Sequence, residues 1–180
     1  MYSLKAYQCI VNSEVKSGIM IGGRVNGKIT PKTWFIKYEN ELLSVEEGPN
    51  LVQARERHSC LIIENDDQKL GIIVGGEYHG ISLKSTEILD LKGSPISWSL
   101  GTELSLDYII DSTLYQHKSY GCLLIGGIQL SNNNILEHRI LEFDSITFAW
   151  QEIYSEPRNT HLPTFALPIS NNLVKCEENN

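Results

Sequence analysis

Hydrophobic residues along the chain come in short runs that end in a pair of glycines followed by a different residue. The run Leu70–Val74 leads into Gly75-Gly76-Glu77, and similar runs lead into Gly22-Gly23-Arg24 and Gly126-Gly127-Ile128. A fixed period of about 50 residues is typical of proteins built from one repeated supersecondary unit. The pattern therefore predicts a repeat array of three similar units.

Alternating apolar and polar positions, separated by Gly, Pro, Asn and Asp turns, predict four short strands in each unit. In the first unit, where Asn26-Gly27 supplies a tight turn, we expect strands at Lys5–Val11, Ser17–Gly23, Thr33–Tyr38 and Leu42–Val45. In the second unit we expect His58–Glu64, Leu70–Tyr78, Ser85–Leu91 and Ser97–Leu100. In the third we expect Ser112–His117, Gly121–Ile128, His138–Phe143 and Phe148–Ile153. Four strands without helical periodicity predict one antiparallel sheet for each unit, and hence an all-β chain.

Three further features recur with the glycine pairs. A bulky residue followed by an acid ends the third strand, at Tyr38-Glu39, Leu89-Asp90 and Phe143-Asp144. A tryptophan lies in the fourth strand at Trp98 and Trp150, with Val45 in its place in the first unit. An Arg-x-x-His sequence precedes the first strand at Arg55 to His58, is missing before the third unit, and recurs at Arg158 to His161.

Together these residues resemble the repeat of the kelch family. The resemblance implies an all-β, kelch-type β-propeller with three four-stranded antiparallel blades, at 4–50, 55–101 and 111–154. The stretch 158–180 would then hold the first strand of a fourth blade, at Thr164–Ile169, so the ring would be incomplete.

Each recurring residue has an expected structural role. The glycines allow strands to approach a crowded axis, and the indoles fill the gap between adjacent blades. Glu39, Asp90 and Asp144 should accept backbone N–H groups in the turns, and His58 and His161 should hydrogen-bond locally with Arg55 and Arg158.

Three blades of this width cannot close a ring, so two blade faces should be left uncovered. Three explanations remain open. The sequence is a piece of a longer kelch protein, or two copies form a homodimer that closes a six-bladed ring, or the chain is an incomplete paralogue.

Charge and cysteine spacing exclude several classes of protein. The net charge is −7, with no strong cluster of Lys or Arg among the 180 residues, which disfavours nucleic acid and anionic membranes as partners. No apolar run is long enough to cross a membrane and no signal peptide is evident, so a cytoplasmic location is expected. The four cysteines are far apart, so we expect them to be reduced and structural, with no metal site.

No motif for nucleotide binding, metal binding or nucleophilic catalysis is present. We therefore expect a non-catalytic protein-protein interaction module without a cofactor, whose loops at 24–33, 77–84 and 128–137 contact a protein partner. The candidate contact residues are Arg24, Glu77, Tyr78, His79 and Gln129. The alternative is an enzyme on the same propeller, of the metal-dependent oxidase or lyase type. That alternative would need a pocket that gathers His79, His117 or His138 with carboxylates.

Overall fold

The computed structural model describes residues 4–5, 9–14, 17–105, 110–117, 121–128 and 136–158. Every regular element in these ranges is a β-strand, so the all-β prediction is confirmed. Twelve of the strands form three four-stranded antiparallel sheets, and each sheet follows the order of the chain. Sheet 1 contains β2 (Cys9–Glu14), β3 (Ser17–Ile21), β6 (Thr33–Glu39) and β7 (Leu42–Glu47). Sheet 2 contains β8 (Ser59–Glu64), β9 (Lys69–Val74), β12 (Thr86–Asp90) and β13 (Trp98–Leu100). Sheet 3 contains β14 (Ile110–His117), β15 (Gly121–Ile128), β16 (Leu136–Asp144) and β17 (Ala149–Arg158).

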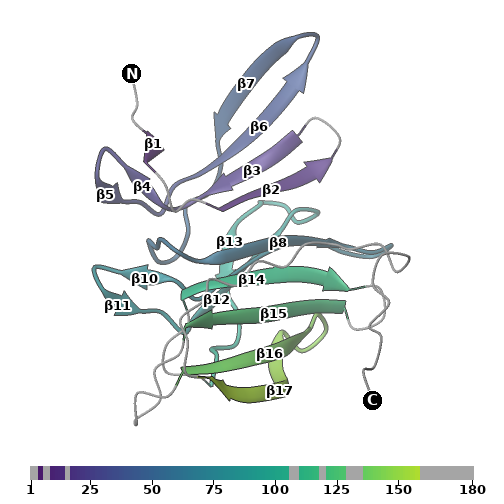
Figure 1. Ribbon diagram of the computed structural model, residues 1–180. Coiled ribbons are helices and arrows are strands. Elements are labelled where there is room, and N and C mark those ends of the chain that lie inside the picture. Colours follow the sequence, from purple (N-terminus) through teal and green to yellow (C-terminus); the bar gives the residue numbers. More distant parts are fainter. Residues whose placement is uncertain are drawn as a thin grey trace, which may run out of the picture.

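Two small hairpins leave sheets 1 and 2 directly after the glycine pairs. They are β4 (Arg24–Val25) with β5 (Lys28–Ile29), and β10 (Glu77–Tyr78) with β11 (Ile81–Ser82). Their tips have two successive residues with positive φ, as tight hairpin turns require: 52° and 78° at Asn26-Gly27, and 51° and 79° at His79-Gly80. Both hairpins lie on the same side of the molecule, and β1 (Leu4–Lys5) pairs with β4 (Figure 1).

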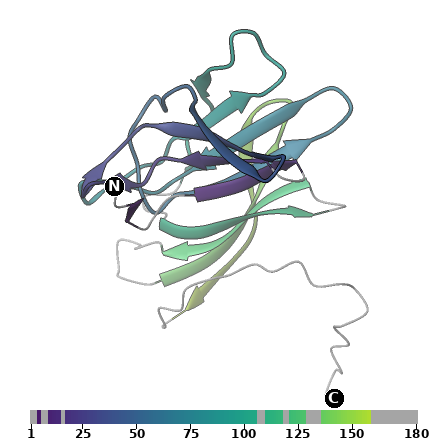
Figure 2. The same ribbon diagram turned by 90° about the horizontal axis from the view of Figure 1, so that it is seen from above.

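The three sheets are stacked in chain order, with sheet 2 in the middle (Figure 1), and their strands overlap when the molecule is seen from above (Figure 2). Alternation along β9 explains how sheet 2 fills both interfaces: Ile73 packs towards sheet 1, whereas Ile72 and Val74 pack towards sheet 3. The core between sheets 1 and 2 consists of Ile19, Ile21, Leu51, Cys60, Ile73, Leu89 and Trp98. The core between sheets 2 and 3 consists of Leu70, Ile72, Val74, Ile88, Leu104, Leu114, Cys122, Leu124, Leu141 and Phe143.

Most predicted strands differ from the structure by one or two residues at an end, and three differ by more. One of the three is β17, which continues to Arg158 beyond its expected end at Ile153. Instead of one strand at Lys5–Val11, the chain has β1 ending at Lys5 and β2 running from Cys9 to Glu14. The strand expected at Leu70–Tyr78 ends at Val74, because Gly75 and Gly76 have φ values of 68° and 84° and turn the chain into β10. The strand expected at Thr164–Ile169 lies outside the described residues, as do His161 and the Arg158 side chain.

Strand pairing defines equivalent positions in the three sheets. Four residues before each glycine pair stand Gly18, Gly71 and Cys122, which pair with Ile36, Leu89 and Phe143. Those residues pair in turn with Val45, Trp98 and Trp150 on the fourth strands. Val45 therefore occupies the tryptophan position, as the repeat predicts.

The expected equivalence of Tyr38 with Leu89 and Phe143 is wrong, because Ile36 takes that place. Hairpin β6–β7 continues beyond the pair of Ile36 with Val45, and Tyr38 lies on this extension. Tyr38 is 44% exposed, whereas Leu89 and Phe143 are buried. Asp90 and Asp144 do accept turn N–H groups, from Lys92 at 2.9 Å and from Ile146 at 2.8 Å. The bonds from Ile146 and Thr147 also lower the pKa of Asp144.

The glycine pairs make room for the segment 51–58, which connects sheet 1 to sheet 2. The Gly23 N–H donates to the Arg55 carbonyl at 2.8 Å. A Cβ atom on Gly22 would lie 2.9 Å from that carbonyl oxygen, and one on Gly76 would lie 2.5 Å from the Glu56 carbonyl oxygen. Real side chains do not tolerate such contacts with backbone, so glycine is needed at both places.

The cysteines differ from the prediction. Cys60 is disulfide-bonded, so the expectation that all four are reduced is wrong. Cys122 is free, and its burial raises the pKa of the thiol to about 12, which leaves it unreactive. Within the described ranges, no helix is long and apolar enough to cross a membrane.

Candidate functional site

A buried ion pair anchors the segment between sheets 1 and 2. The side chains of Arg55 and Glu87 are fully buried, and Arg55 Nη2 donates to Glu87 Oε1 at 2.7 Å. The remaining carboxylate capacity is filled by the N–H groups of Val52 and Gln53, at 2.7 and 3.0 Å. Arg55 also donates to the Gly75 carbonyl at 2.9 Å, so one side chain joins the segment to the second glycine pair. Burial lowers the pKa of Arg55, and the charge of Glu87 opposes that shift.

His58 lies beside this pair and does not hydrogen-bond with Arg55, which corrects the expectation for this residue. It is 8% exposed, and neither ring nitrogen has a partner that satisfies hydrogen-bond geometry among the described residues. Burial, together with the positive charge of Arg55, lowers the pKa of His58 to about 3, although the Ile21 backbone partly offsets the shift. His58 is therefore a neutral core residue at physiological pH.

A row of ion pairs runs along the edge from which the two hairpins project. Arg24 donates twice to the Glu56 carboxylate. Arg57 donates to both oxygens of Asp111, with Nε to Oδ1 at 3.0 Å, and to Glu77 Oε1 at 3.1 Å. The bonds with Asp111 and Glu77 raise the pKa of Arg57, Asp111 contributing most. We call these five residues the charged rim.

Two of the candidate contact residues from the sequence analysis belong to the charged rim. Arg24 and Glu77 begin the two hairpins, and they are linked through the adjacent residues Glu56 and Arg57. The backbones of Glu56 and Glu77 also exchange two hydrogen bonds, at 2.8 and 3.0 Å. Tyr78 and His79 lie beyond them at a hairpin tip, exposed, with ring centroids 4.4 Å apart. Gln129 lies outside the described residues.

Sequence reasoning missed Glu56, Arg57 and Asp111. The alternating charges of Arg55-Glu56-Arg57 were a usable signal, because such a run directly before a buried strand needs partners. Nothing in the sequence pattern indicated Asp111, which reaches Arg57 only because sheets 2 and 3 are stacked. Arg57 and Asp111 occupy equivalent positions at the start of the first strands, and both have positive φ, 58° and 55°.

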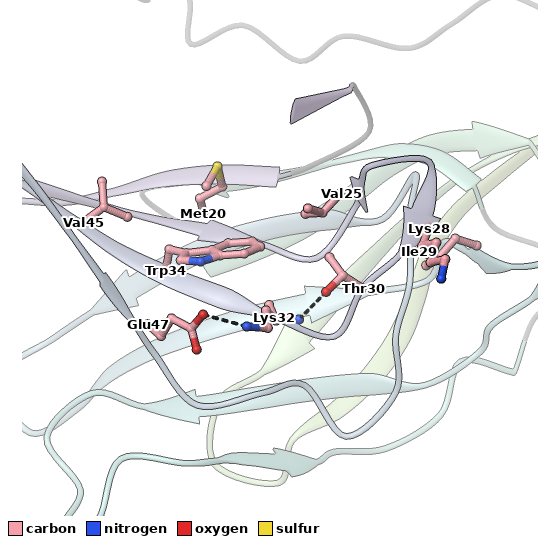
Figure 3. A pocket seen from close by; sticks show the side chains of 9 residues that line it. All are labelled: Met20, Val25, Lys28, Ile29, Thr30, Lys32, Trp34, Val45 and Glu47. Carbon is pink, nitrogen blue, oxygen red and sulfur yellow. Dashed lines mark hydrogen bonds and ion pairs between the residues drawn. The ribbon is translucent and has the colours of Figure 1, made fainter. Parts of the chain in front are cut away.

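A groove of about 550 Å³ opens on the face of sheet 1 that points away from sheet 2 (Figure 3). Met20, Trp34 and Val45 line it from the sheet, and Val25 and Ile29 line it from the β4–β5 hairpin. Lys32 bonds Glu47 at 2.6 Å within the groove, and Lys28 lies on the hairpin. The sequence predicts two uncovered sheet faces. The face of sheet 1 that carries this groove is one of them, and it presents apolar side chains.

The histidines proposed for an enzyme site do not converge. His79 is on the hairpin side, whereas His117 ends β14 on the opposite side of the stacked sheets (Figure 1). The His138 side chain lies outside the described residues. Across the part of the chain that the structure describes, no three His, Cys, Asp or Glu residues are grouped so that they could hold a metal ion.

Comparison with known proteins identifies a shared fold and no more. No protein-family model matches the chain, and no curated protein sequence matches it. Its structure matches 125 solved chains, among them that of YjhT, with a TM-score of 0.60 and 15% sequence identity. The match covers 81% of this chain and 45% of YjhT, so the chain spans less than half the length of that protein.

Proposed function

We propose that the chain is part of a kelch-type β-propeller and acts as a non-catalytic module that binds a protein partner. The recurring glycine pairs, the equivalent tryptophan positions and the three stacked four-stranded sheets support the propeller assignment. The blades are then the units 4–50, 55–101 and 111–154. A ring of this kind needs further blades, which either a longer chain or a second copy would supply.

The observation that carries the binding role is the charged rim, which fixes two hairpins side by side. Arg24 and Glu77 are each held by an ion pair, so the hairpins are ordered before a partner arrives and lose little entropy on binding. Tyr78 and His79 project beyond them, and aromatic side chains on a rigid support are frequent anchors in protein interfaces.

The disulfide of Cys60 bears on the cellular compartment of the protein. Disulfides are rare in the cytosol, so the disulfide of Cys60 weighs against the cytoplasmic location expected from the lack of a signal peptide and of a membrane-spanning run.

The binding role is tested with a double variant of the hairpin tip, Tyr78→Ser with His79→Ser. Proteins captured by the immobilised chain from a cell extract are identified, and the affinity of the purified partner is then measured by calorimetry. Loss of an aromatic anchor, worth about 1–2 kcal/mol, should weaken binding about tenfold. Ile146→Ser is the matched control, because Ile146 is 86% exposed and lies on the β16–β17 turn. Equal affinity of the tip variant and the control would refute a role for the hairpin tip.

A further inference from the structure

Sheets 2 and 3 each have one face that packs on the preceding sheet, and we call this face, and the equivalent face of sheet 1, the receiving face. In sheet 2 this face contains Ile73, Leu89 and Trp98. The equivalent residues of sheet 3 are Leu124, Phe143 and Trp150, which pack against sheet 2. By strand pairing, the same positions in sheet 1 are Met20, Ile36 and Val45. The face of sheet 1 that carries the groove is therefore its receiving face. No other sheet among the described residues covers it.

The opposite face of sheets 1 and 2 packs on the next sheet, and we call this face, and the equivalent face of sheet 3, the covering face. Ile19 and Ile21 have this role in sheet 1, and Ile72 and Val74 have it in sheet 2. Strand pairing places Leu123 and Ile125 at the same positions in sheet 3. The outer face of sheet 3 therefore repeats the apolar pattern of a covering face, at the other end of the stack.

One direct contact shows which positions meet across an interface. Trp150 Nε1 of sheet 3 donates to Thr86 Oγ1 of sheet 2 at 2.8 Å. The covering-face position of Thr86 therefore faces the receiving-face position of Trp150. At the two ends of the stack, these two positions are occupied by Ile140 on sheet 3 and Val45 on sheet 1.

At these positions the two ends of the stack differ from the interface between sheets 2 and 3. Thr86 offers a hydroxyl to an indole, whereas Ile140 and Val45 are both aliphatic and need no polar partner. Replacing the indole by valine also leaves space, and Val45 lines the groove of about 550 Å³. Charge matches as well, since Glu142 stands on the outer face of sheet 3 at the position of Ile88, and Lys28 borders the groove.

We propose that the open face of sheet 1 is the docking site for the outer face of sheet 3 of a second copy of this chain, so that two copies form a closed ring of six sheets. The proposal rests on the propeller architecture proposed above. Both interfaces of such a ring are identical head-to-tail contacts, which close when each copy spans half of the ring. In each interface Ile140 of one copy lies against Val45 of the other.

The test measures the solution mass of the full chain by light scattering on a sizing column over a wide range of concentration. The wild-type chain should have the mass of two copies. Val45→Glu and Ile140→Lys should each reduce the mass to one copy, because each places an unpaired charge in both interfaces. Leu42→Glu is the matched control: Leu42 lies on the same strand with 73% exposure but on the other side of β7 from Val45, and the mass should stay at two copies.

Mixing the two charged variants distinguishes docking from misfolding. In a mixed ring, one interface is wild-type and the other pairs the introduced glutamate of one copy with the introduced lysine of the other, so a two-copy species should reappear. A monomeric wild-type chain, or a mass that climbs with concentration, would overturn the proposal. So would equal behaviour of Val45→Glu and Leu42→Glu, or a mixture that stays monomeric. The Tyr78→Ser/His79→Ser variant should remain two-copy, so failure of ring closure and failure of partner binding are separate results.

Discussion

The receiving faces of sheets 1 and 2 have the same strand pairing and very different surroundings. Trp98 on sheet 2 is 7% exposed, whereas Val45, at the equivalent position on sheet 1, is 55% exposed. The backbone positions are set by each sheet alone, but the burial is supplied by the neighbouring sheet. Most of the stability of such a stack therefore belongs to pairs of sheets, as expected for repeat proteins.

A neighbouring position on the third strand shows that a charged residue in a closed interface needs partners for its charge. Trp34, Glu87 and Leu141 are equivalent, since each pairs with the residue that lies two before a glycine pair. Glu87 is tolerated in the closed interface because Arg55 and two backbone N–H groups satisfy it. The open face has an indole there, which can remain in contact with water or accept an apolar partner.

The largest loss of stability is expected at the buried ion pair between sheets 1 and 2. Arg55→Ala leaves the Glu87 carboxylate buried without its cation and should reduce the free energy of unfolding by about 3–5 kcal/mol. Arg57→Ala removes the adjacent, partly exposed arginine of the charged rim and should cost no more than about 1 kcal/mol. Urea denaturation measures both values, and similar losses for the two variants would contradict the distinction between buried and rim pairs.

A smaller effect is expected at the tryptophan position. Trp98→Ala empties a buried site and should cost about 3 kcal/mol, the lower end of the range for such truncations, because β13 is an edge strand. Val45→Ala at the equivalent position should change the free energy of unfolding by less than about 0.5 kcal/mol. Both are measured at a concentration where the chain is monomeric. A large loss for Val45→Ala under that condition would mean that the face is covered within one chain.

The smallest effect is a dependence on pH that arises from His58. Its pKa falls from the ordinary value of 6.5 to about 3 on folding, so between these values the unfolded state binds more protons. The contribution of this group to stability is therefore constant above pH 6.5 and decreases as pH falls below it, by about 2 kcal/mol between pH 6.5 and 5. His58→Leu should remove this slope, and His79→Leu, at an exposed histidine, is the control. An unchanged slope in His58→Leu would assign the pH dependence to other groups.

The sequence alone determined the local architecture of this protein. Short alternating strands, paired glycines and an Asn-Gly turn specify antiparallel sheets and hairpins, because they act over neighbouring residues. The glycine pairs were expected to let strands approach a crowded axis, whereas Gly22 and Gly76 lie against the backbone of Arg55 and Glu56. The tryptophan position was also correct, since the spacing within one sheet fixes it.

Tertiary structure decided the contacts between sheets. Asp111 meets Arg57 across two sheets, and Cys60 is disulfide-bonded, although neither feature has a spacing that a sequence pattern could reveal. Tyr38 was misaligned because the length of hairpin β6–β7 depends on pairing rather than on composition. The charged rim exists only because separate repeats are stacked, whereas the groove beside Val45 lies on a face of sheet 1 that no other described sheet covers.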